Sequence, residues 1–202
     1  MKFKPTHTPG EIIIELGRND LLPVTANGPH QNASVFKLKN ILVPIDFSDC
    51  SKKALLYALP YGKEFSAQIT LLYVAQFHYA ASELDSAEIP VLEDQHMKRA
   101  KDELLLLAKQ LPDCLKIKTA VVSGKPFEEI VATAKALNAD LIIIGTHGAM
   151  KMQHEFLGST AERVARFADC PVLIVRERGR DFVSTSRAKK VVKPYSMERS
   201  AA

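Results

Sequence analysis

The sequence has no tryptophan and only three cysteines among its 202 residues. The thiols at Cys50, Cys114 and Cys170 are odd in number and far apart, so they form neither a disulfide framework nor a Cys-x-x-Cys redox or metal motif. No apolar run approaches the ~20 residues that cross a bilayer, and the short run at residues 12–14 lies between two glutamates. We therefore expect reduced thiols in a soluble, cytoplasmic protein with no membrane partner.

The main part of the chain also lacks an excess of positive charge. Residues 176–202 hold eight basic and three acidic residues, a net charge of +5, so the other residues carry −1 of the total of +4. A nucleic-acid-binding domain needs clustered positive charge on its folded surface, so we expect no nucleic-acid partner. With 47% hydrophobic and 25% charged residues, the composition is that of a globular protein and excludes a fibrous or wholly disordered chain.

Short apolar runs alternate with helically spaced apolar residues through the middle of the chain. The runs predict strands over residues 40–46, 68–75, 116–122, 140–145 and 171–175. The helical spacing predicts helices over residues 54–65, 89–111, 126–137 and 160–168. Such alternation produces parallel strands joined by right-handed crossovers, so we predict an α/β fold with a doubly wound, five-stranded parallel sheet.

The chemistry of the strands indicates their order. The first, second and fourth strands are apolar on both faces, as central parallel strands must be, whereas the third alternates and suits an edge. An order of 3-2-1-4-5 follows, with the apolar strand at residues 171–175 on the other edge. Because an exposed apolar edge invites pairing, we predict a homodimer through residues 171–175, with the N-terminal extension as the rival cover.

The two ends of the chain differ from this middle part. Residues 1–38 contain four prolines and three glycines without a sustained helical period, which predicts a mostly irregular extension with one short strand at residues 11–16. Residues 39–176 form the predicted domain. Residues 177–202 are polar and basic and are predicted to be a flexible tail.

A candidate site follows from the strand order. Ligands of open parallel sheets bind beyond the carboxyl ends of the strands where the order reverses, which here is the crevice between the first and fourth strands. Three features converge there: glycine backbone without side chains, the start of a helix with free amides, and one carboxylate. The glycines and the free amides suit a phosphate, and the carboxylate suits a polar group of the same ligand. The residues are Asp46, Gly145, Gly148, Gly158, Ser159 and Thr160.

Simpler interpretations of the same residues stay open. Glycine, serine and threonine are common in any strand-to-helix turn. Asp46 is able to cap the helix that follows the first strand. His147 is either a proton donor at the phosphates or a turn residue, and Lys151 either reaches a phosphate or stays solvated.

The glycine spacing resembles the signature of the universal stress protein family. The resemblance is carried by Gly145-x2-Gly148-x9-Gly158-Ser159, by the following CPVLIV at residues 170–175 and by the opening ILVPIDFS at residues 41–48. It covers about residues 39–176. It implies an adenine-nucleotide alpha-hydrolase-like fold, homodimerisation through the last strand and, for members with this glycine spacing, ATP binding.

The resemblance also implies a role for each matching residue. The adenine or ribose side would be held by Asp46, with Pro44 and Ile45 contributing backbone or packing, and Val74 would meet adenine. Gly145 and Gly148 would flank the ribose and phosphates. Phosphate would be bound by Gly158, Ser159 and Thr160. Ala161 departs from members that carry a hydroxyl residue there, which bears on the number of phosphate contacts.

Two classes of function compete. One is a stress or signalling protein that binds ATP, AMP or another adenine nucleotide and passes the signal to a downstream protein. The other is a slow ATPase or an ATP-using enzyme of the nucleotide alpha-hydrolase superfamily. The loop after the first strand reads Asp46-Phe-Ser-Asp-Cys50 without glycine, and neither a P-loop lysine, a GxGxxG turn nor a catalytic acid–base pair is present. We therefore favour binding over turnover. A flavin or electron-transfer protein is a third reading, and Mg²⁺ would accompany a triphosphate, although one carboxylate is not a metal site.

Overall fold

The computed structural model describes residues 2–5, 12–15, 37–77, 89–148, 157–178 and 183. The chain forms two units, residues 1–35 and residues 36–202. In the first unit, β1 (Lys2–Pro5) pairs antiparallel with β2 (Ile12–Glu15), Phe3 lying opposite Ile14. The sequence analysis predicts only the second of these strands. It misses β1 because two lysines and a proline in four residues lack a strand pattern.

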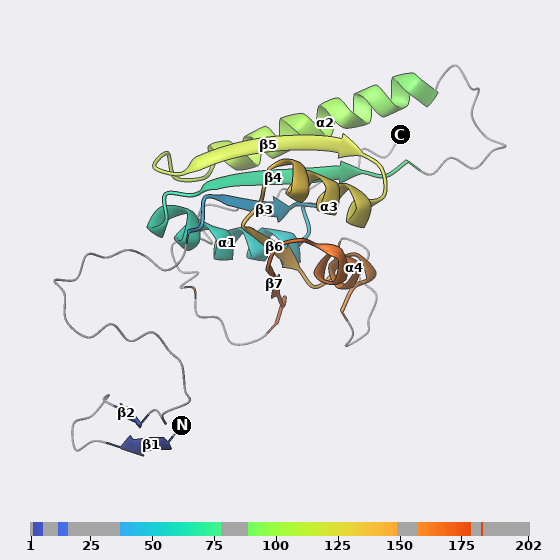
Figure 1. The fold of residues 1–202 in the computed structure, drawn as a ribbon. Helices are drawn as coiled ribbons and strands as arrows, with labels where there is room; N and C mark the ends of the chain where they lie inside the picture. The colour runs from blue at the N-terminus through green and yellow to red at the C-terminus, as the bar shows by residue number, and fades with distance from the viewer. Residues whose placement is uncertain are drawn as a thin grey trace. The chain divides into compact units, whose positions relative to one another are not determined.

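The second unit alternates strands and helices as predicted. Its elements are β3 (Asn40–Pro44), α1 (Asp49–Glu64), β4 (Gln68–Ala75), α2 (Ile89–Lys109), β5 (Lys116–Ser123), α3 (Pro126–Ala136), β6 (Leu141–Gly145), α4 (Ser159–Phe167) and β7 (Val172–Val175). The five strands are parallel and run β5-β4-β3-β6-β7 across the sheet (Figure 1). In order of occurrence this is 3-2-1-4-5, which confirms the predicted doubly wound fold.

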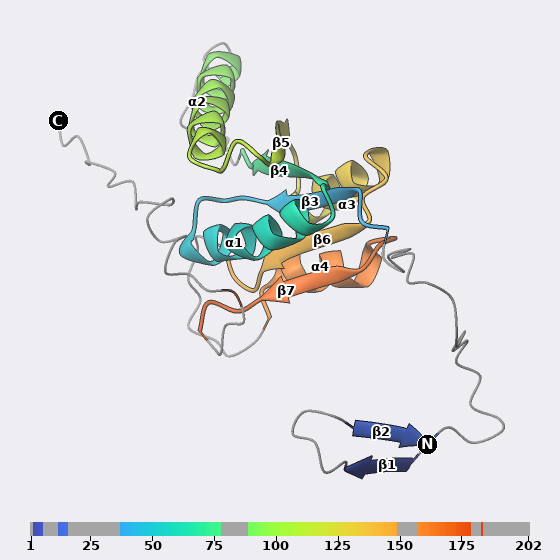
Figure 2. The same cartoon turned by 90° about the vertical axis from the view of Figure 1, so that its left-hand side faces the viewer.

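Each face of the sheet is buried by one pair of helices, and Figure 2 shows α1 and α2 on one side with α3 and α4 on the other. Alternate strand residues supply the two cores: Ile41 and Val43 join the cluster under α1 and α2, whereas Leu42 joins the cluster under α3 and α4. All three side chains are almost fully buried. Burial on both faces is why the central strands are continuously apolar.

The outer strands differ from this pattern. β5 has no fully buried residue and alternates between exposed and half-buried positions over its first four residues, and β7 is half-buried over its first three positions. Both lie at edges of the sheet, as the sequence predicts. Val183, within the predicted tail, packs against the α1 and α2 cluster. Among the helices of the described segments, none is both long and apolar enough to span a membrane.

Candidate functional site at the carboxyl ends of β3 and β6

Strand β3 delivers two buried residues and then a carboxylate to the carboxyl edge of the sheet. Pro44 and Ile45 are buried, and the Ile45 amide donates to the Leu72 carbonyl of β4 at 2.8 Å, which extends the ladder by one residue. The Ile45 side chain belongs to the core under α1 and α2. Ile45 therefore faces the crevice with backbone, while Asp46 is the first polar side chain beyond the strand.

The Asp46 carboxylate is held in place by the start of α1. Its Oδ1 accepts from the Ser48 amide at 3.1 Å and from the Ser48 hydroxyl at 2.6 Å. Ser48 itself is the N-cap of α1, because its Oγ accepts from the Ser51 amide at 3.2 Å. Asp46 is therefore not the N-cap of α1, but its Oδ1 stabilises the N-cap residue Ser48 through two hydrogen bonds.

The second oxygen of Asp46 lies against the loop after β6. A Cβ on Gly148 would stand 2.7 Å from Asp46 Oδ2, closer than real side-chain contacts allow. Glycine is therefore required at position 148 while Asp46 keeps this position. The two residues, 102 positions apart in sequence, bring the ends of β3 and β6 together as the strand order predicts.

Gly158 brings the start of α4 to the same place. Its amide donates to the Thr146 carbonyl at 2.8 Å, and a Cβ on Gly158 would approach that carbonyl oxygen to 2.6 Å. Gly158 is the N-cap of α4 and has no side chain to satisfy the amides of the first helical turn. Those amides, from Ser159 onward, therefore begin next to the loop that faces Asp46.

Thr146 and Cys50 link the carboxyl ends of β6 and β7 to the start of α1. Thr146 is buried and its hydroxyl lies 3.5 Å from Cys50 Sγ and 3.0 Å from His147 Nδ1. Cys50 Sγ also lies 3.5 Å from the Val175 carbonyl of β7, and a Cβ on Gly145 would meet Sγ at 2.8 Å. The sequence analysis misses this role of Thr146 and Cys50. The placement of a threonine between two required glycines is the signal that points to it.

Other predicted site residues fall on or beyond the margin of this arrangement. Val74 is half-buried and packs against the core under α3 and α4, two residues past the level of Pro44. Ala161 is buried in that same core. Lys151 lies outside the described residues. Within the described segments, no group of three or more His, Cys, Asp or Glu side chains is close enough to hold a metal ion.

The model of the universal stress protein family matches residues 37–176, which contain both strand ends and the start of α4. The chain belongs to the universal stress protein family. Universal stress protein MJ0531 of Methanocaldococcus jannaschii is 36% identical over 141 residues, which cover 69% of this chain and 82% of that protein.

Solved structures agree with this assignment of fold. The structure of MJ0577, also from M. jannaschii, has a TM-score of 0.59 at 32% identity and covers 72% of this chain and 100% of that one. Universal stress protein UspA from Lactobacillus plantarum has a TM-score of 0.56 at 29% identity, over 70% of this chain and 99% of that chain. The universal stress protein domain thus accounts for the five-stranded sheet and its helices, and β1 and β2 lie outside the matched residues.

Proposed function

We propose that this universal stress protein domain binds an adenine nucleotide, ATP, in the crevice between β3 and β6 and that it acts through binding, as a stress-response or signalling protein. The observation that carries the proposal is the convergence of three segments on one point. Asp46 Oδ2 leaves no room for a Cβ on Gly148, and the Thr146 carbonyl leaves none on Gly158. These contacts hold the loop after β6 and the start of α4 against the end of β3, and the first-turn amides of α4, which no N-cap side chain satisfies, are the groups able to meet an anion there.

Electrostatics gives the nucleotide a direction in this crevice. The positive end of the α4 dipole and its first-turn amides attract phosphate, aided by the hydroxyls of Ser159 and Thr160. The carboxylate of Asp46 repels phosphate and accepts hydrogen bonds, which suits a ribose hydroxyl or a base amino group. Phosphates therefore lie towards α4 and the nucleoside towards the end of β3, where Pro44 and Ile45 would contribute backbone and Val74 is half-buried at the end of β4.

Binding without rapid turnover fits the way the polar groups are used. Oδ1 of Asp46 already accepts two hydrogen bonds from Ser48, and Nδ1 of His147 lies against the Thr146 hydroxyl. Both groups thus have structural tasks at the ends of their strands. A Mg²⁺ ion would arrive with ATP, held by its phosphates.

Calorimetry with ATP, AMP and adenosine tests the site. One hydrogen bond to a charged group is worth roughly 1.5–3 kcal/mol, so Gly158→Val should weaken ATP binding at least about tenfold, with adenosine much less affected. Asp46→Ala should weaken all three ligands alike. Gly62→Ala is the matched control, because its Cβ meets the flexible end of Ile69 at 2.6 Å within the core.

Two outcomes would count against the proposal. Unchanged ATP affinity in both Gly158→Val and Asp46→Ala would remove the site. Sustained phosphate release above about one per second would favour the ATP-using enzyme, since that is the low end of ordinary enzyme rates.

We further propose that β7 pairs with β7 of a second copy. The strand lies at an edge of the five-stranded sheet, and its residues Val172, Leu173 and Ile174 are only half-buried among the residues that the structure describes. Apolar edges of this kind are usually covered. Sedimentation at about ten micromolar should give a dimer, and a monomer would refute this arrangement.

A further inference from the structure

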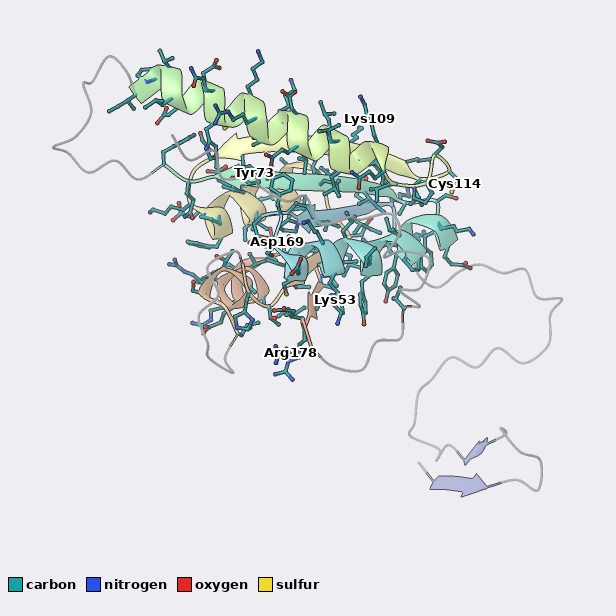
Figure 3. The ribbon with its side chains drawn as sticks, turned by 180° about the vertical axis from the view of Figure 1, so that it is seen from behind. Lys53, Tyr73, Lys109, Cys114, Asp169 and Arg178 are labelled. Atoms are coloured by element: carbon teal, nitrogen blue, oxygen red, sulfur yellow. The ribbon has the colours of Figure 1, made fainter. Side chains whose placement is uncertain are left out.

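An aromatic cluster lies beside Asp46 and takes no part in the proposed contacts with the nucleotide. It consists of Phe47, Tyr73, Phe77 and His96, which come from the β3–α1 connection, from β4 and its end, and from α2. The ring centroids of Phe47 and Tyr73 are 5.4 Å apart, and those of Phe77 and His96 are 5.5 Å apart with the rings edge to face. Tyr73 lies on β4 beneath α2 (Figure 3), where its hydroxyl is 3.2 Å from His96 Nε2.

Phe47 has a backbone conformation that a phenylalanine seldom adopts. Its φ is +62°, in the left-handed region that favours glycine. A bulky residue stays in such a conformation only where its surroundings impose it. Here the ring is half-buried against the core under α1 and α2 and against Tyr73, whose hydroxyl is in turn bonded to α2.

The backbone of Phe47 decides where the Asp46 carboxylate points. Residue 47 stands between Asp46 and Ser48, and both Ser48 donors must reach Asp46 Oδ1 across it. The other oxygen, Oδ2, then points at Gly148. A change in φ at residue 47 would separate Ser48 from Oδ1 and turn Oδ2 away from the crevice. Asp46 is close enough to the aromatic cluster to act on Tyr73. The pKa of Tyr73 is raised first by burial, and then by the charges of Glu103 and Asp46.

We propose that Phe47 is a positioning residue for Asp46: its ring, anchored by Tyr73 and through it by His96, holds the left-handed backbone that aims the carboxylate across the crevice. The inference rests on the proposed function, because Asp46 is taken to contact the nucleoside. It makes α2 part of the support of the site although α2 contributes no proposed ligand contact.

The test is a double-mutant cycle read as ATP affinity. Phe47→Ala removes the ring and leaves a Cβ that disfavours positive φ, so ATP should bind about tenfold more weakly, the equivalent of one lost hydrogen bond to the ligand. In the Asp46→Ala background the same substitution should change affinity by less than about twofold, because two residues that act through one contact are not additive. Phe47→Tyr keeps the ring and should restore binding.

Two further variants separate positioning from general destabilisation. Phe65→Ala is the matched control: Phe65 is half-buried against the same core but follows the far end of α1, about 24 Å away along a 16-residue helix. It should lower the unfolding temperature and leave ATP affinity within about twofold of the original, the scatter expected of distant sites. Phe47→Gly permits the φ without the ring and should weaken binding as Phe47→Ala does.

The outcomes are distinguishable. If Phe47→Ala weakens ATP equally with and without Asp46, or if Phe47→Gly binds like the original protein, the ring does not position Asp46 and the inference falls while the proposed function stands. If the original protein binds no adenine nucleotide, the proposed function falls first. Amide exchange at Ser48 in the nucleotide-free protein then decides positioning: faster exchange in Phe47→Ala than in Phe65→Ala supports it, and equal exchange refutes it.

Discussion

Strand β3 has an aspartate near each of its ends, and the two are used in opposite ways. At the amino edge of the sheet, Oδ2 of Asp140 accepts from the amides of Lys39 and Asn40 at 2.7 and 2.8 Å, while the Asp140 amide donates to the Asn40 carbonyl. At the carboxyl edge, Asp46 gives one oxygen to Ser48 and turns the other towards Gly148. The Asp140 carboxylate joins two strands, whereas the Asp46 carboxylate faces a glycine in the loop after β6.

The comparison shows that a carboxylate at a strand end is not in itself a sign of a binding site. The carboxyl edge differs from the amino edge in having three glycines close to its aspartate. A Cβ at Gly145, Gly148 or Gly158 would come within 2.8 Å of another atom, and each of those atoms lies at the carboxyl edge of the sheet. Backbone atoms leave little room for a side chain at Gly145 and Gly158, and Gly148 is limited by the Asp46 carboxylate in its present position, whereas the amino edge is closed by ordinary hydrogen bonds between β3 and the start of β6.

Replacing each aspartate separately by alanine gives the largest expected effects and tests whether the two edges of the sheet have different roles. Asp140→Ala loses two hydrogen bonds to a partly exposed carboxylate, so the free energy of unfolding should fall by about 2–3 kcal/mol with ATP affinity unchanged. Asp46→Ala should cost about 1 kcal/mol of stability through the weakened cap of α1 but about tenfold in ATP affinity. Urea unfolding and calorimetry on both variants measure the two effects. A loss of ATP affinity in Asp140→Ala would show that the edges are not separate.

The close packing of Gly145 against Cys50 predicts a smaller effect, on the free energy of unfolding. Gly145→Ala places a Cβ 2.8 Å from Cys50 Sγ and 3.0 Å from the Cys50 carbonyl carbon, so it should lower the free energy of unfolding by about 2 kcal/mol. Adding Cys50→Ala removes the sulfur but leaves the carbonyl. The double variant should therefore be more stable than the sum of the two single variants by roughly 0.5–1 kcal/mol, measured by urea unfolding. Strict additivity would mean that Sγ does not limit residue 145.

Much of this architecture can be predicted from the sequence because it depends on burial. Central strands that are apolar on both faces predict the strand order, and that order places Asp46 near Gly148, as the structure has them. The start of α4 at Gly158-Ser159 followed from helix-capping chemistry.

The parts that sequence reasoning missed depend on contacts between distant residues. The positive φ of Phe47 is imposed by Tyr73 and His96, which lie 26 and 49 positions further along the chain. The sequence predicts a cap at Ser48, Asp49 or Ser51, with Asp46 as the alternative, and the geometry selects Ser48. Val74 shares the face of Leu72, two residues before it on β4, and both join the core under α3 and α4.

Alkaline pH tests how strongly the carboxyl edge buries an ionisable group. Burial and the charges of Glu103 and Asp46 raise the pKa of Tyr73 above its ordinary value. A raised pKa in the folded state favours the neutral phenol, so this contribution to stability is complete below about pH 10, the usual pKa of an unfolded tyrosine, and is lost as the pH rises further. Urea unfolding between pH 9 and 11 should show a shallower decline for Tyr73→Phe. An equal decline would mean that Tyr73 titrates alike in both states.

The smallest expected effect concerns the reach of the Asp140 charge at the amino edge. Cys170 precedes β7 and is half-buried, and its pKa is raised by burial first and then by the charges of Asp140 and Asp169. Alkylation at pH 8, followed by mass spectrometry, should therefore label the exposed Cys114 faster than Cys170, since only the thiolate reacts. Asp140→Asn and Asp169→Asn each remove one negative charge and should raise the Cys170 rate about twofold without changing that of Cys114, because partly exposed charges interact weakly through solvent. A different outcome would contradict this: only Asp140→Asn raises the alkylation rate of Cys170, and it raises that of Cys114 as well. The variant would then have destabilised the amino edge of the sheet, and the Asp140 carboxylate would act there through its hydrogen bonds and not through its charge.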